Sequence, residues 1–97
     1  MPVYVTLFKL TDQGIKNIKE APGRVQEAFK AVEAMGGKVT HFYTLLGEYD
    51  YASIGEFPSD EEAAAFLYAL GSAGNVRTTT MRAFTLEEFT GIVGKLP

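Results

Sequence analysis

The stretch VTHFYTLLGEYDYASIGEF, residues 39–57, decides the fold of this chain. Its first half, through residue 46, contains no Asp, Glu, Lys or Arg, and both halves are rich in the β-branched and aromatic residues that favour strands. Gly47 and Glu48 supply the turn between the two halves. The sequence therefore predicts a hairpin with strands at Lys38 to Leu46 and Tyr49 to Phe57, and Pro58 ends the second strand.

Before this hairpin, the sequence predicts a strand, a short helical turn and a helix. The strand runs from Pro2 to Leu10, where β-branched and aromatic residues are again frequent. Thr11 and Asp12 offer N-cap chemistry for the short turn. Pro22 suits the first position of the helix, whose apolar residues recur at helical spacing until Gly36 ends it.

After the hairpin, the pattern predicts a helix, a fourth strand and a terminal helix. Ser59 and Glu62 form a capping-box pattern, and Thr85 and Glu88 repeat it on the far side of a strand at Val76 to Phe84. The order is β-α-β-β-α-β with an extra C-terminal helix. We therefore predict one ferredoxin-like α+β domain over residues 1–97, with an antiparallel sheet and its helices on one face.

The face of the sheet that the two long helices leave uncovered needs another partner. Alternation along the strands gives one face rich in Tyr, Phe and Thr, with Tyr4, Thr6 and Phe8 on the first strand and Tyr49 and Tyr51 on the third. A solvated face carries charge instead. Taking the aromatic face as the uncovered one, we predict a homodimer in which the uncovered faces of two copies meet.

Composition and charge exclude several classes of function. The 97 residues suffice for one domain, and the net charge of -3 comes from Lys and Arg interspersed with Asp and Glu, so we expect no nucleic-acid binding. One histidine and no cysteine cannot make a zinc site, and no phosphate-binding glycine motif occurs, so we expect neither metal nor cofactor. The longest uncharged run has 14 residues, which is too short to span a membrane, and no signal peptide is visible. We therefore expect a cytoplasmic protein.

Three segments resemble the GYD domain family, and the similarity extends over essentially the whole chain. They are TDQG at residues 11–14, GEYD at 47–50 and GNVRTTTMRAF at 74–84. The family's Gly-Tyr-Asp motif appears here as Gly47-x-Tyr49-Asp50, with Glu48 between the glycine and the tyrosine. This resemblance implies a ferredoxin-like domain that assembles as a dimeric α/β barrel.

A second resemblance is more distant. The segments at residues 47–50 and 76–78 are also similar to the ligand-sensing module of leucine-responsive and asparagine-type (Lrp/AsnC) regulators. That likeness implies the same fold and the binding of amino acids at subunit interfaces. The chain has no basic helix-turn-helix segment, so it corresponds to the sensor half alone.

Two residues are candidates for catalysis. His41 is the only side chain with an ordinary pKa near neutrality, and as a general base it needs an orienting group, for which Asp50 is a candidate. The alternative for His41 is a hydrogen bond to a neighbour on the strand or at an interface. The alternative for Asp50 is structural: its carboxylate accepts backbone N–H groups or pairs with Arg77 or Arg82.

Three functions are compatible with these residues. The leading hypothesis is a homodimeric module that binds or senses a small apolar or aromatic metabolite, with His41 and Asp50 as polar anchors. The other residues expected to bind this ligand are Phe42, Tyr43, Tyr49, Tyr51 and Arg77. The alternatives are a cofactor-independent enzyme of the monooxygenase or isomerase kind with His41 as base, and an assembly protein without a ligand.

Overall fold

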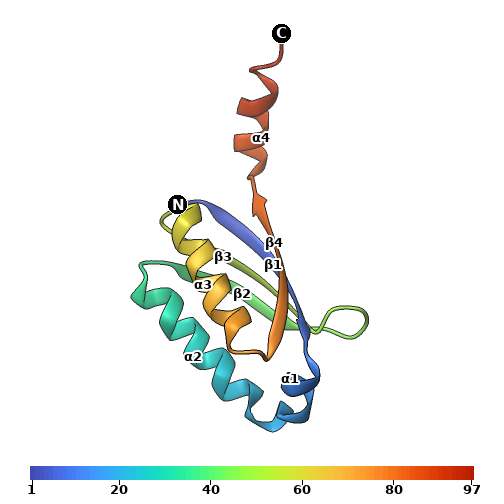
Figure 1. Ribbon diagram of the computed structural model, residues 1–97. Helices are drawn as coiled ribbons and strands as arrows, with labels where there is room; N and C mark the ends of the chain where they lie inside the picture. Colours follow the sequence, from blue (N-terminus) through green and yellow to red (C-terminus); the bar gives the residue numbers. More distant parts are fainter.

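Four strands form one antiparallel sheet in the order β2-β3-β1-β4 in the computed structural model, which describes residues 1–97 (Figure 1). The strands are β1 (Val3–Leu10), β2 (Lys38–Thr44), β3 (Tyr51–Glu56) and β4 (Val76–Ala83). The helices are α1 (Asp12–Lys16), α2 (Ala21–Ala34), α3 (Asp60–Ser72) and α4 (Leu86–Val93), with a short 3-10 turn at Ile18–Glu20. The predicted ferredoxin-like α+β fold with an extra C-terminal helix is confirmed.

Side-chain caps start three of the helices where the sequence predicts them. Thr11 accepts a hydrogen bond from the amide of Gly14, and Ser59 accepts one from the amide of Glu62. Thr85 forms the complete capping box: its hydroxyl accepts from the Glu88 amide at 3.0 Å, and Glu88 Oε1 accepts from the Thr85 amide at 2.9 Å. Each cap satisfies an amide that has no partner within its own helix.

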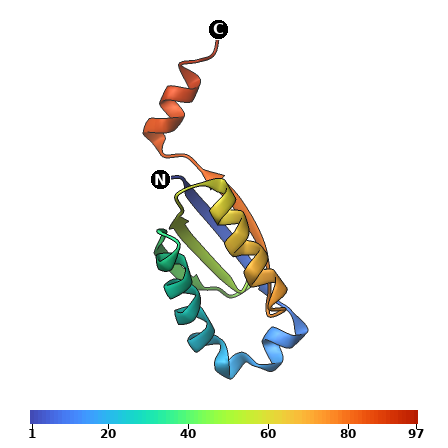
Figure 2. The same ribbon diagram turned by 60° about the vertical axis from the view of Figure 1, so that its left-hand side comes forward.

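The two long helices lie on the same side of the sheet (Figure 2). Tyr4 of β1 packs there with Val32 of α2, Ala63 of α3 and Phe57, and these four residues are the buried hydrophobic cluster. The expectation that the Tyr, Phe and Thr side chains form the uncovered face is therefore wrong. Alternation separates two faces but does not say which one the helices cover, and here the rings lie beneath the helices.

A β-bulge alters the alternation in β2. Val39 pairs with Gly55 and His41 with Ile54, so Thr40 is the extra residue in the strand. As a result Val39 and Phe42 share the covered face, although strict alternation assigns them to opposite faces. Strict alternation along β2 therefore misplaces Val39.

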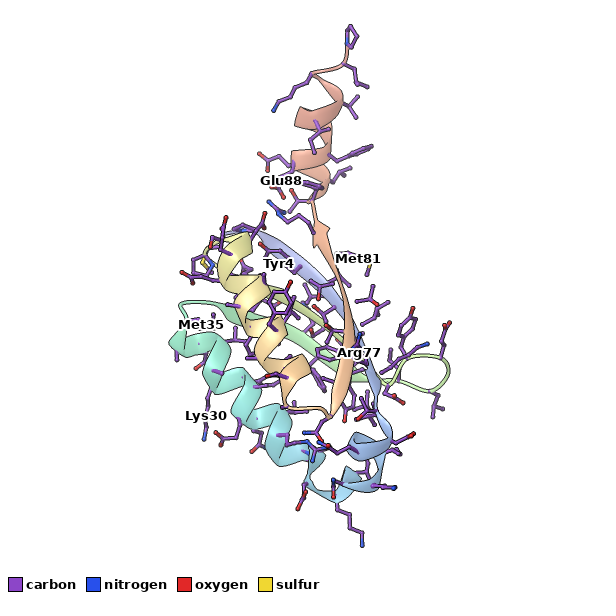
Figure 3. The ribbon with its side chains drawn as sticks, viewed as in Figure 1. Tyr4, Lys30, Met35, Arg77, Met81 and Glu88 are labelled. Atoms are coloured by element: carbon purple, nitrogen blue, oxygen red, sulfur yellow. The ribbon has the colours of Figure 1, made fainter.

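The middle of the uncovered face is apolar and mainly aliphatic, while charged residues such as Glu56, Lys9 and Arg77 lie toward its ends. Val5 of β1 lies between Ile54 of β3 and Met81 of β4, and Leu7 lies beside Ala52 on the same face. Figure 3 shows Met81 projecting from β4 on the side away from α3, and its side chain is 43% exposed. The uncovered face is thus formed by different residues from those expected.

Candidate functional site

An apolar cleft opens between α2, α3 and the covered face of the sheet. Its volume is about 910 Å³, and 19 of its 24 lining residues are hydrophobic. The helices contribute small side chains along it, Ala28 and Ala31 from α2 and Ala65 and Ala69 from α3. Because alanine fills little space between a helix and a sheet, this composition leaves a cleft where larger residues would complete the core.

Four aromatic rings line the sheet and α2 sides of this cleft. Phe42 lies at their centre, with its ring centroid 5.3 Å from that of Tyr51, 5.5 Å from Phe29 and 6.4 Å from Phe8. Edge-on and tilted arrangements at these separations are the favourable ones for aromatic pairs. Of the residues predicted to bind a ligand, the structure brings Phe42 and Tyr51 together here.

The other predicted ligand residues lie outside the cleft. His41 and Tyr43 are on the uncovered face, where their rings stack at 6.4 Å, and His41 Nδ1 lies 3.2 Å from the Thr40 hydroxyl. Arg77 is opposite Lys9 on that same face. Tyr49 lies in the β2–β3 loop, with Lys9 Nζ 5.2 Å from its ring centroid.

Asp50 secures the β2–β3 loop to β1. Its Oδ2 accepts a hydrogen bond from the Leu10 amide at 2.8 Å, and its own amide donates to the Phe8 carbonyl at 2.8 Å. Capture of a backbone amide is the structural alternative expected for this carboxylate. Gly47 in the same loop has φ +113°, which only glycine adopts without strain. The Gly47-x-Tyr49-Asp50 motif therefore has a structural role, and no hydrogen bond joins Asp50 to His41.

The other two segments that resemble the GYD family, residues 11–14 and 74–84, contact each other. The Thr11 amide donates to the Asn75 carbonyl at 3.0 Å, and the Thr11 hydroxyl donates to the Gly74 carbonyl at 2.6 Å. A Cβ on Gly14 would lie 2.1 Å from the same Asn75 oxygen, so only glycine fits. These contacts hold α1 against the turn between α3 and β4, at one end of the cleft.

Tyr4 is a residue whose special environment the sequence did not reveal. Its hydroxyl donates to Asp60 at the start of α3, and burial, followed by this hydrogen bond, raises the pKa of Tyr4 to about 12. Figure 3 shows Tyr4 between α3 and the sheet. The pair joins β1 to α3 and closes the fold beside the other end of the cleft. Alternation along β1 assigns Tyr4 to one face of the sheet, but it predicts the burial of Tyr4 only when the face covered by the helices is known.

The C-terminal helix α4 extends away from the rest of the molecule (Figure 1). None of its residues is buried, and its apolar side chains are largely exposed: Leu86 79%, Phe89 55%, Ile92 41% and Val93 44%. The predicted apolar side of this helix is present, but it packs on nothing in its own chain. No helix of the protein is both long enough and apolar enough to cross a membrane.

Comparisons with known proteins agree with this architecture. The sequence profile of the GYD domain matches residues 4–93. A Thermus thermophilus protein named glutamine synthetase and cystathionine beta-lyase binding protein is 30% identical over 89 residues, which cover 91% of this chain and 94% of that protein.

Several solved structures share the fold. The protein TTHA0845 from Thermus thermophilus has a TM-score of 0.56 at 23% identity, over 88% of this chain and 95% of that one. MtbAldR has a TM-score of 0.59 at 15% identity, over 87% of this chain and 52% of that one. Ribosomal protein S6 from Thermotoga maritima has a TM-score of 0.57 at 17% identity, over 97% and 98% of the two chains.

Proposed function

This chain belongs to the GYD domain family, and from that premise and its exposed apolar surfaces we propose that it is a homodimeric protein that binds other proteins. The name of the Thermus thermophilus relative describes a protein that binds two enzymes. The observation that carries the proposal is α4, an apolar helix without a partner in its own chain.

The dimer contact in this proposal is the uncovered face of the sheet. Val5, Leu7 and Ile54 lie side by side there, with Met81 and Tyr43 beside them, 43% and 61% exposed. An antiparallel sheet tolerates one solvated face when that face is polar, but the middle of this one is apolar. Packing it against a second copy removes it from water and enlarges a small core.

The contact with another protein is the apolar side of α4 in this proposal. Isolated helices shorter than about 12–15 residues are marginal in water, and α4 has 8 residues. Its capping box supports the first turn, but packing supplies most of the stability of helices in proteins. A groove on a partner protein that accepts Leu86, Phe89 and Ile92 would provide that packing.

The test uses two substitutions that separate these contacts. Ile54→Glu places a charge in the proposed dimer contact, and Phe89→Glu places one on the apolar side of α4; Glu87→Gln is the control on α4. Analytical ultracentrifugation measures self-association. Binding to glutamine synthetase and cystathionine β-lyase from the protein's own source is measured by calorimetry, because these are the enzymes named for the relative.

Each substitution has its own expected result. We expect Ile54→Glu to give monomers, and Phe89→Glu to remain dimeric while losing the partner enzyme. A dimer that is unaffected by Ile54→Glu but dissociates with Phe89→Glu would show that α4, not the sheet, joins the two copies. Failure of the unmodified protein to bind either enzyme would remove the support taken from the relative's name.

A second candidate function is the binding of a small apolar molecule in the cleft. Ligand sites are concave, mostly apolar and commonly about 300–1,000 Å³ in volume, and the cleft of about 910 Å³ fits this description. Native mass spectrometry of the protein isolated from its own host detects such a ligand as added mass. We expect Ala69→Phe, which places a ring in the cleft, to abolish that mass. The enzyme alternative has less support, because His41 and Asp50 have separate partners outside the cleft.

A further inference from the structure

We propose that the cleft binds an anionic amphiphile, a straight apolar chain with a carboxylate head, and that Arg24 binds the head. This inference rests on the second candidate function above and specifies the chemical class of its ligand. It is carried by the position of Arg24 at one end of the cleft and by the incomplete hydrogen bonding of its guanidinium.

The cleft has a polar end and an apolar end. Arg24 and Glu27 lie on the first turns of α2, and Asn75 lies where β4 begins, close to Leu10 at the end of β1. At the other end are Met35 and Phe66, together with Val39 where β2 begins. Arg24 and Met35 are eleven residues apart, so the cleft follows α2 for about 16 Å. That is an elongated apolar space with polarity at one end.

The guanidinium of Arg24 has unused hydrogen-bonding capacity. Its Nη1 donates to the Asn17 carbonyl at 3.2 Å, while its Nη2 is buried and has no acceptor. A buried donor without a partner is costly, and a carboxylate can accept two parallel N–H bonds from a guanidinium. The Arg24 side chain is 30% exposed, and the proposal requires its guanidinium to turn so that Nη2 reaches a head group in the cleft.

Two carboxylates near Arg24 determine how strongly an anion can bind. Glu20 Oε2 lies 3.8 Å from Arg24 Nη1, which is a long distance for an ion pair. The Glu20 side chain is 75% exposed, so solvent screens the attraction between the two groups. Glu27 lines the same end of the cleft, but its carboxylate is paired with Lys30 at 3.4 Å and is largely exposed, so solvent screens its charge. A ligand carboxylate therefore competes mainly with Glu20. Removing the charge of Glu20 should strengthen the binding of the ligand carboxylate to Arg24.

The experiment compares three probes of one chain length, dodecanoate, dodecan-1-ol and dodecyltrimethylammonium, each below the concentration at which it aggregates. Isothermal titration calorimetry gives the affinities, and amide NMR spectra of the full chain locate the binding. The variants are Arg24→Gln, Glu20→Gln and Ala69→Phe. The matched control is Arg77→Gln, which removes the same charge from the opposite face of the sheet.

We expect dodecanoate to bind about tenfold or more tightly than dodecan-1-ol, since a hydrogen bond to a charged group is worth that much. Arg24→Gln should remove the advantage of dodecanoate and leave dodecan-1-ol unchanged. Glu20→Gln should increase dodecanoate affinity, and Arg77→Gln should change nothing. Ala69→Phe should weaken the binding of both dodecanoate and dodecan-1-ol. The dispersion of its amide NMR spectrum shows whether this variant is folded.

The outcomes distinguish this inference from the candidate function on which it rests. Equal binding of dodecanoate and dodecan-1-ol, unaffected by Arg24→Gln but weakened by Ala69→Phe, would overturn the role of Arg24 and keep the apolar cleft site. Preference for dodecyltrimethylammonium would overturn the sign of the head group. Binding of none of the probes to the folded protein would overturn both the inference and the cleft as a site for apolar chains.

Discussion

Replacing Gly14 with alanine tests the contact that holds α1 to the turn before β4. In an open helix this substitution stabilises by about 0.8–1 kcal/mol, because alanine is the better helix former. At Gly14 the new Cβ would lie 2.1 Å from the Asn75 carbonyl oxygen, and backbone cannot yield as a side chain can. Forcing an extra methyl group into a packed site costs about 1–3 kcal/mol.

Moving α1 away from this clash also breaks hydrogen bonds. The Thr11 amide and hydroxyl bonds to the carbonyls of Asn75 and Gly74 both cross this contact, at 3.0 and 2.6 Å. Each is worth about 1 kcal/mol net. Allowing for the helix-propensity gain, we expect Gly14→Ala to lower the free energy of unfolding by about 2 kcal/mol. That corresponds to a urea midpoint about 1–2 M lower.

The control for this experiment is Gly71→Ala in α3, where no atom lies within 4 Å of the added Cβ. We expect this variant to be neutral or to gain up to about 1 kcal/mol from helix propensity. Both variants are unfolded in urea at one fixed protein concentration, since the proposed dimerisation would make the midpoint concentration-dependent. A Gly14→Ala midpoint equal to or above that of Gly71→Ala would refute the close contact between α1 and Asn75.

Three further predictions concern single hydrogen bonds. Tyr4→Phe should remove the tyrosine absorbance change at 295 nm that titrates near pH 12. Because the pKa of Tyr4 is raised from 10.0 to about 12 in the folded protein, its contribution to stability is complete below pH 10 and is lost as pH rises to 12. Asp50→Ala should cost about 1–3 kcal/mol in urea unfolding, by leaving the amide at the end of β1 without its acceptor. Thr85→Ala should cost α4 about 1 kcal/mol of helix stability, seen as loss of amide protection in that helix alone.

The order of elements could be predicted from the sequence because its signals are local. Thr11, Ser59 and Thr85 precede their helices by one residue, and Gly36 lies just after α2. The ends of the hairpin were less accurate: β2 ends at Thr44, not Leu46, and β3 begins at Tyr51, not Tyr49. The reason is that Leu45, Leu46 and Tyr49 are apolar enough to continue the strands on either side of the turn, but they belong to the longer loop that Asp50 fastens to β1.

The candidate site depends on long-range packing and was therefore only partly predictable. Phe42 and Tyr51 are on the covered face, whereas His41 and Tyr43 are on the opposite one, and a bulge at Thr40 decides where β2 changes its alternation. Nothing local to the sequence marks that bulge. The cleft itself exists because alanines of two helices, more than 30 residues apart in the chain, face the same space. Such a coincidence appears only once the helices are placed on the sheet.

The three apolar surfaces of this molecule lie on different elements and can therefore act independently. The uncovered sheet face is on the side opposite α2 and α3, the cleft lies beneath those helices, and α4 projects beyond the end of β4 (Figures 1 and 2). Within one chain, the residues that form one of these surfaces do not belong to another. A dimer through the sheet would still present two clefts and two α4 helices, so self-association, ligand binding and partner binding need not compete. Coupling among them would require α3 or β4 to shift, because these elements border the cleft and lead into the other surfaces.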